Sequence, residues 1–291
     1  MSRSGLYLML AGVLLGTGIS HAESFPARLV MGNGQVWIGQ IIRRDGNWIE
    51  FNKNNAAQSV RVGASTVKEL KFKVALDAEK VSRMIQDRAF DEAINAINGA
   101  IAPFDEYSDI PSNLTRYKSI LMELLYRTGK YDDSLAISSE IAKDGRSLEL
   151  QEKARVYQAL ALVDTGRIKE IEALFSEYGW ELEPTGDDVA AEKLYIAAKY
   201  MVLKKEFNRA MEYAARVVAF HSQDPDWIQP AELLCAQVYT ELGLYESADE
   251  VCREILLFYK DTPEFDEATR LKIKIEKLRA EQRVKDSLKP E

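Results

Sequence analysis

Residues 236–255 read AQVYTELGLYESADEVCREI, and this stretch decides the fold. Its apolar residues recur at spacings of three and four, which is typical of amphipathic helices. Gly243 interrupts the pattern, as glycine does where a helix ends in a left-handed turn. The stretch therefore predicts two helices joined by a tight turn, with Tyr245 and Ala248 buried where the helices cross.

The turn of this hairpin has four further copies upstream. In each copy an aromatic residue or isoleucine stands three residues before a small or branched residue, and the lead residues are 41, 37, 39 and 38 positions apart. The pairs are Phe90 and Ala93, Tyr131 and Ser134, Ile168 and Ile171, Phe207 and Ala210, and Tyr245 and Ala248. A period of this length predicts a mainly α fold, a right-handed α-solenoid of about five stacked helical hairpins over residues 76–263.

The copies resemble tetratricopeptide repeats, which have a small residue on the first helix, Gly-x-aromatic-x-x-Ala at the turn, and a small or apolar residue on the second helix. The matching residues are Val81, Arg88, Phe90, Ala93 and Ala100; Met122, Gly129, Tyr131, Ser134 and Ile141; Ala159, Gly166, Ile168, Ile171 and Tyr178; Ala198, Lys205, Phe207, Ala210 and Val217; and Ala236, Gly243, Tyr245, Ala248 and Ile255. The spacing exceeds the family's 34 residues. We therefore expect extended turns between repeats, around Pro103–Asn113, Gly179–Asp188 and His221–Pro230.

The resemblance also implies a binding surface. In that family the first helix of each repeat lines a concave face at fixed offsets from the small residue. Carried over to this chain, those positions are Arg116, Ser119, Glu123, Tyr126, Arg127, Val156, Leu160, Tyr195, Lys199, Leu233 and Gln237. Such a mixture of aromatic, apolar and charged groups suits an extended peptide or protein segment.

Residues 25–74 have a different pattern, in which short β-branched and aromatic runs alternate with turn signals such as Asp45-Gly46. This pattern predicts a small antiparallel sheet. The expected strands are Arg28–Met31, Gln35–Arg43, Trp48–Asn52, Ser59–Val62 and Thr66–Phe72. Five strands in a segment this short suit a small barrel, and Gly39 inside the second run indicates a bend or bulge.

The first half of this segment resembles an Sm-like barrel. The residues that carry the resemblance are Gly34-Gln-Val-Trp-Ile-Gly39-Gln-Ile41, Asp45-Gly46 and Ile49-Glu-Phe51. The second half departs from the pattern, because Arg61 and Gly63 are not adjacent as the family's RNA-contacting Arg-Gly pair is. The resemblance therefore implies only the fold. We expect Trp37 and Trp48 in the core; the alternative is exposed ligand contacts.

The N-terminus predicts export. Arg3, the apolar run Leu6–Leu15 and the sequence Ser20-His21-Ala22 form the three parts of a signal peptide over residues 1–22. The alternative is a membrane anchor, but Gly5–Ile19 is shorter than the roughly 20 residues that span a bilayer. We expect a periplasmic or extracellular protein, at most peripheral to the envelope.

The two cysteines, Cys235 and Cys252, lie in the last repeat on its two helices. In an exported protein they are a possible disulfide. The alternative is packing, because helices pack about 8–10 Å apart whereas a disulfide needs Cα atoms within about 7 Å.

Residues 264–291 end the repeat array. Asp266–Lys289 is rich in charged residues and carries Leu271, Ile275 and Leu278 at helical spacing. This predicts a capping helix with a solvent-facing side. The alternative is a short coiled coil with another chain.

Composition limits the function. The 291 residues carry a net charge of −8 with no basic block, which argues against nucleic acid. The expected mature chain has one histidine, His221, and no phosphate-binding Gly-rich loop, so we expect neither an enzyme, nor a metal, nor a cofactor. The sequence predicts a protein-interaction scaffold of unspecified oligomeric state. The alternative is an assembly subunit of an envelope secretion or outer-membrane machine.

Overall fold

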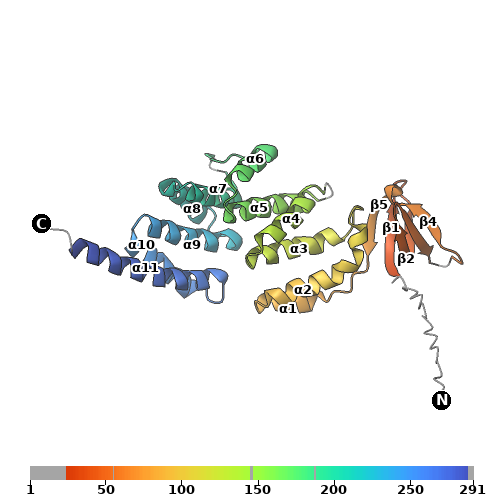
Figure 1. The fold of residues 1–291 in the computed structure, drawn as a ribbon, viewed down its shortest axis with the longest axis horizontal. Coiled ribbons are helices and arrows are strands. Elements are labelled where there is room, and N and C mark those ends of the chain that lie inside the picture. The colour runs from red at the N-terminus through yellow and green to blue at the C-terminus, as the bar shows by residue number, and fades with distance from the viewer. Residues whose placement is uncertain (1–23, 55, 145–146, 187, 288–291) are drawn as a thin grey trace, which may run out of the picture. The chain divides into compact units, whose positions relative to one another are not determined.

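A computed structural model describes residues 24–54, 56–144, 147–186 and 188–287 (Figure 1). The predicted signal peptide lies outside the described residues. The chain divides into two compact units, one formed by residues up to 75 together with 101–114, the other by 76–100 together with 115–291. We describe each unit by itself.

The first unit contains an antiparallel five-stranded sheet with the order β4-β3-β2-β1-β5. All five predicted strands are confirmed, with ends shifted by a few residues. Their bounds are β1 Phe25–Met31, β2 Val36–Asp45, β3 Trp48–Lys53, β4 Val60–Gly63 and β5 Val67–Phe72. Within the described residues β4 and β5 are the two edge strands of the sheet and do not pair with each other, so closure into a barrel stays a prediction.

Gly39 lies where two strands approach closely. A Cβ at this position would come within 1.9 Å of the Asn52 carbonyl oxygen on β3, so no side chain fits there. Two residues later the pairing of β2 with β3 shifts register, between Ile41 and Arg43. The predicted irregularity in the second strand is therefore confirmed.

Residues 101–114 complete this unit by covering the edge of β5. The Leu70 amide donates to the Pro111 carbonyl at 2.8 Å. The Asn113 side-chain amide bonds both backbone groups of Phe72, at 2.8 and 3.0 Å. Phe104, in the 3₁₀ helix η2 (Ala102–Tyr107), packs 4.4 Å from the ring of Phe72. The sequence predicted only an extended turn here, because edge pairing across 41 residues leaves no local signal.

The tryptophans differ from expectation. The core of the sheet is filled by fully buried aliphatic residues and Phe51. Trp48 is 49% exposed at the start of β3, so its predicted place in the core was wrong. Trp37 is half-buried, with the Lys53 ammonium 3.3 Å above its ring. Phe72, Phe104 and Tyr107 are also buried in this unit, so its core already holds four aromatic rings without either tryptophan.

The second unit consists of helical hairpins in chain order, and the mainly α architecture of about five hairpins is confirmed (Figure 1). Asp77, Ser147 and Asp224 cap helix starts by accepting backbone hydrogen bonds. The first helices of the hairpins are α1 Ala78–Gln86, α3 Leu114–Arg127, α5 Leu148–Asp164, α7 Ala191–Leu203 and α9 Pro225–Glu241. The second helices are α2 Phe90–Ile101, α4 Tyr131–Ala142, α6 Ile168–Tyr178, α8 Phe207–Phe220 and α10 Tyr245–Phe258.

The left-handed turns predicted at the repeat glycines are present, and the two repeats without a glycine have the same turn. Gly129, Gly166 and Gly243 have φ values of 75°, 69° and 75°. Arg88 and Lys205 stand at the equivalent positions of their repeats and have φ values of 60° and 59°. A side chain in this conformation costs about 1–2 kcal/mol, so these two turns hold strain that the glycine turns lack.

The helix crossings also follow the predicted register. Ala93, Ser134, Ile171, Ala210 and Ala248 are all 0% exposed. The turn-side aromatic residues Tyr131, Phe207 and Tyr245 lie half-buried beside them. Small residues at these points let the two helices of a hairpin approach closely.

The loop between α6 and α7 is an extended turn, as predicted. Trp180 packs on Phe175 and Tyr178 with ring centroids 5.5 and 5.7 Å apart. Arg216 of α8 donates to the Pro184 carbonyl at 2.9 Å. His221, just after α8, contacts the Val189 carbonyl at 3.0 Å, which places it in a turn between repeats as expected.

The last helix, α11 (Pro263–Ser287), continues the stack. Ala268, Leu271 and Ile275 are buried in a cluster with residues of α9 and α10, so the helix packs on the last hairpin, and its role as a cap stays a prediction. Residues 280–285 are exposed. No helix in the described part of the chain is both long and apolar enough to cross a membrane.

Candidate functional site

Three first helices bring a tyrosine, a carboxylate and a lysine together. The Tyr126 hydroxyl on α3 donates to Asp164 Oδ2 on α5 at 2.6 Å. The Lys199 ammonium on α7 donates to Asp164 Oδ1 at 2.5 Å. Two of these residues belong to the predicted concave face. Asp164 was missed, although it stands five residues after Ala159, the same offset that placed Arg127 relative to Met122.

Aromatic rings surround this group. The Tyr126 ring lies 5.5 Å from Tyr131 and 5.4 Å from Tyr157. On the other side, Tyr195 lies 5.7 Å from Trp227, and the Lys199 ammonium lies 5.6 Å from the Tyr195 ring. We refer to Tyr126, Tyr131, Tyr157, Asp164, Tyr195, Lys199 and Trp227 as the tyrosine cluster.

Burial sets the protonation of this cluster. Burial raises the pKa of Tyr126 and of Tyr195, and the charge of Asp164 adds to the shift for Tyr126. Both phenols are therefore neutral hydrogen-bond donors at neutral pH. Burial alone would lower the pKa of Lys199, but the charge of Asp164 and its hydrogen bond to the ammonium oppose this, so the pKa is raised and the ammonium stays charged.

Other predicted positions lie at the surface. Glu123 of α3 pairs with Lys153 of α5 at 2.5 Å. Arg116, Arg127 and Gln237 are exposed. These residues present charged and polar groups that an approaching chain can reach.

Four predicted positions are packing residues instead. Ser119, Val156, Leu160 and Leu233 are only 3%, 6%, 2% and 8% exposed. Val156 and Leu160 belong to the main helical core, and Leu233 belongs to the cluster beneath α11. In this chain neighbouring helices cover these positions, so we do not retain them as contact residues.

A cavity of about 570 Å³ opens between the α7–α8 turn, α9 and α11. It includes Gln237, a predicted position, but much of its wall comes from α11, which the sequence identified only as a cap. The cavity is lined by Val202, Leu203, Lys205, Phe207, Gln237, Val238, Glu241, Glu267, Arg270, Leu271 and Lys274. Its wall therefore contains both apolar and charged side chains.

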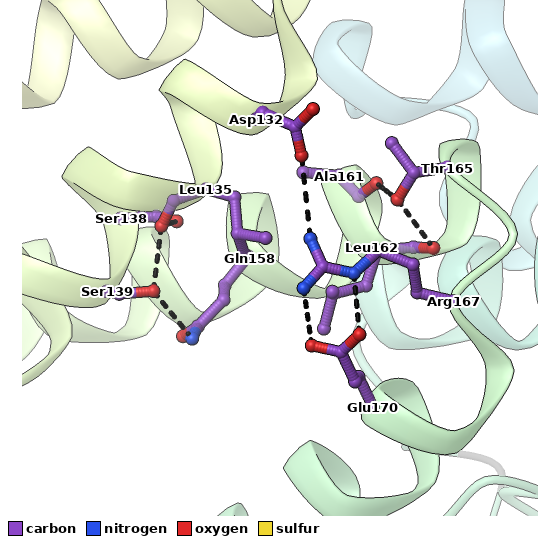
Figure 2. Close-up of polar contacts among 10 residues, drawn as sticks. All are labelled: Asp132, Leu135, Ser138, Ser139, Gln158, Ala161, Leu162, Thr165, Arg167 and Glu170. Carbon is purple, nitrogen blue, oxygen red and sulfur yellow. Dashed lines mark hydrogen bonds and ion pairs between the residues drawn. The ribbon is translucent and has the colours of Figure 1, made fainter.

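Figure 2 shows polar contacts whose function is structural. The Arg167 guanidinium bonds Glu170 within α6 at 2.7 Å and reaches Asp132 of the preceding hairpin at 3.5 Å. Gln158 of α5 donates to the Ser139 hydroxyl of α4 at 3.0 Å. These contacts join consecutive hairpins. Among the described residues no group of three or more His, Cys, Asp or Glu side chains is placed to hold a metal ion.

The cysteines are separate in the structure. Cys235 and Cys252 are free and buried. Cys235 packs in the main helical core, whereas Cys252 packs in the cluster that includes α11. This arrangement favours packing over the predicted possible disulfide.

No protein-family model matches the chain, and no curated protein sequence matches it. Solved structures with similar helical hairpins are tetratricopeptide repeat proteins. MamA from Desulfovibrio magneticus is 13% identical, with 63% of this chain and 94% of that chain covered and a TM-score of 0.35. A tetratricopeptide repeat protein from Parabacteroides merdae is 15% identical, with 73% of this chain and 78% of that chain covered and a TM-score of 0.35. The TPR2AB domain of yeast Sti1, in its complex with pHSP90, is 12% identical, with 67% of this chain and 83% of that chain covered and a TM-score of 0.31.

The helical unit has a tetratricopeptide-like fold. We base this on the hairpin order, the five left-handed turns and the buried crossings described above.

Proposed function

We propose that the protein is a non-enzymatic scaffold that binds an extended peptide or protein segment on the inner helices of its repeats. The tyrosine cluster supports this proposal most directly. Its phenols and the Lys199 ammonium lie together on three successive first helices, where an extended chain meets them in sequence. The cluster offers large aromatic ring surfaces, of the kind that is enriched in protein interfaces, beside a lysine and a tyrosine that Asp164 holds in place.

We further propose that the protein is exported. This rests on the three-part signal sequence over residues 1–22. Expression of the full chain with a C-terminal tag and N-terminal sequencing of the product checks it. We expect a new N-terminus at Glu23; a product that retains Met1 would contradict export by this signal.

The binding site is tested by two matched pairs of substitutions. Tyr126→Ala with Tyr195→Ala removes two rings of the tyrosine cluster. Phe220→Ala with Phe258→Ala removes two rings that are 66% and 70% exposed at the ends of α8 and α10. We expect the tyrosine pair to abolish capture of an envelope protein that the wild-type chain captures, and the phenylalanine pair to leave capture unchanged. Thermal melts of both proteins show whether they remain folded.

The exposed phenylalanines favour a second candidate function. Phe220 and Phe258 occupy equivalent positions of two repeats, and Leu257 beside them is 73% exposed. Exposed apolar groups that recur in this way are typical of assembly surfaces. If the protein is an assembly subunit, the variant with Phe220→Ala and Phe258→Ala will lose self-association in light scattering or fixed-stoichiometry co-purification in a pull-down. The variant with Tyr126→Ala and Tyr195→Ala will keep both. Capture that survives the tyrosine pair would overturn the scaffold proposal.

A further inference from the structure

The cavity between α7, α9 and α11 has two chemically distinct parts. Val202, Leu203, Phe207, Val238 and Leu271 form an apolar part. The remaining lining residues are polar or charged, with three basic side chains, Lys205, Arg270 and Lys274, and two acidic ones, Glu241 and Glu267. An excess of basic groups stands out in a chain whose net charge is −8.

The charged side chains are not equally engaged. Lys274 pairs with Glu241 at 3.0 Å, and Arg270 pairs with Glu267. No ion pair engages Lys205 anywhere in the described ranges, and its side chain is exposed. Lys205 is therefore the cationic group of this cavity that is available to an incoming anion.

Lys205 also stands at a strained backbone position. Its φ of 59° is the left-handed conformation that Gly129, Gly166 and Gly243 adopt at the equivalent turns. Glycine would relieve a cost of about 1–2 kcal/mol at this position. Strain of this kind concentrates at functional sites, where the side chain contributes something that a glycine cannot.

We propose that this cavity recognises a bulky apolar side chain flanked by an acidic residue in the bound segment. The apolar part of the wall receives the apolar side chain, and Lys205 at the turn binds the neighbouring carboxylate. This inference rests on the proposed scaffold function, because it names the peptide chemistry that one end of the same inner surface selects. The occupant is a peptide segment, and its acidic residue complements the basic excess of the lining.

Labelled synthetic peptides in a Gly/Ser background test the proposal by fluorescence anisotropy on the full chain. The probes carry Asp-Leu-Asp, Lys-Leu-Lys or Asp-Gly-Asp at their centre. We expect the wild-type protein to bind the Asp-Leu-Asp probe at least about tenfold more tightly than either of the others. Against Lys-Leu-Lys this is the size of one charge-assisted hydrogen bond, and against Asp-Gly-Asp it is the size of burying a leucine side chain.

Three variants separate the contributions. Lys205→Gly is expected to lose about tenfold in affinity for the Asp-Leu-Asp probe while its thermal unfolding temperature stays the same or rises. Val202→Phe fills the apolar part of the cavity and is expected to remove the preference for leucine over glycine. Lys169→Ala removes an exposed lysine of α6 that does not line the cavity, and is expected to change nothing.

The outcomes distinguish this inference from the proposed function. Lys205→Gly with unchanged affinity, or a wild-type protein that binds all three probes equally, would overturn the cavity assignment and leave peptide binding standing. A wild-type protein that binds none of the probes at millimolar concentration would overturn the cavity assignment together with the peptide form of the scaffold proposal.

Discussion

The Tyr126 hydroxyl donates to the Asp164 carboxylate across two neighbouring hairpins, 38 residues apart in the chain. Asp164 also accepts from Lys199 of the next hairpin, so one carboxylate joins three repeats. The side chains of Asp164 and Lys199 are only 18% and 17% exposed. A contact placed in this way contributes to the stability of the array.

Removal of Asp164 should therefore destabilise the array. Asp164→Ala leaves the Lys199 ammonium and the Tyr126 hydroxyl without their acceptor, and we expect a loss of about 2 kcal/mol in the free energy of unfolding, measured by urea denaturation. Tyr126→Phe removes one donor only and should cost about 1 kcal/mol. Asp132→Ala is the control: this carboxylate is 86% exposed and its contact with Arg167 is long, at 3.5 Å, so the loss should stay well below about 1 kcal/mol. Equal midpoints for Asp164→Ala and the control would contradict the shared role of Asp164.

The hairpin crossing can be tested in the last repeat. Ala248 is 0% exposed at the crossing of α9 and α10, so Ala248→Leu forces extra volume into a close-packed contact. We expect a loss of about 1–3 kcal/mol in a thermal or urea melt. Ala280→Leu makes the same change on the exposed part of α11 and should be neutral. A variant at Ala248 as stable as the wild type would show that the repeat register is wrong.

Local rules explain why so much of the helical unit could be predicted. The repeat register aligned Arg88 and Lys205 with the turn glycines, and the structure gives both residues the same left-handed conformation. The same register placed Tyr126 and Lys199 on one surface. The register did not predict the burial of Val156, because this burial depends on how successive hairpins pack against each other.

Contacts between distant segments explain what the sequence did not predict. The part of α11 in the cavity wall depends on how α11 docks against α9, and its charged composition indicated only a solvent-facing cap. Trp48 is exposed while aliphatic residues, Phe51 and Phe72 fill the core of the sheet, a packing outcome that strand patterns do not encode.

The thiols should be free and unreactive in the native protein. Burial raises the pKa of Cys235 to about 12 and that of Cys252 to about 11, so almost no thiolate exists at neutral pH. We expect slow labelling by a thiol reagent at pH 8 and two labelled thiols per chain after denaturation without reductant. The reduced, denatured protein is the control. No labelling of the unreduced, denatured protein would establish the disulfide and contradict the packing of the two cysteines in separate clusters.

The docking of α11 should depend on acidity through Asp249. This carboxylate of α10 is 7% exposed; it bonds Arg253 and pairs with Lys272 of α11 at 3.0 Å. The Arg253 hydrogen bond, followed by the Lys272 contact, outweighs burial and lowers the pKa of Asp249 below its usual 3.8. A lowered pKa contributes stability that is present above pH 3.8 and is lost as the pH falls through the folded-state pKa.

Thermal melts between pH 7 and pH 2 check this dependence. We expect Asp249→Asn to be less stable than the wild type at pH 7, and the difference to shrink as the wild-type carboxylate is protonated. Asp266→Asn, at a more exposed carboxylate near the start of α11, is the comparison. A difference that persists unchanged down to pH 2 would contradict the role of the Asp249 charge.

The covering of β5 by residues 101–114 makes the sheet-containing unit discontinuous in the chain. The polypeptide leaves that unit after Ala75, forms α1 and α2, and returns at Ile101 before α3 begins. A gene truncated at residue 75 would encode every strand yet omit Phe104 and Asn113, leaving the Phe72 ring and its backbone groups without their partners. Dissection of the protein therefore calls for a fused fragment in which a short linker replaces residues 76–100, so that the first hairpin is excised as an insertion.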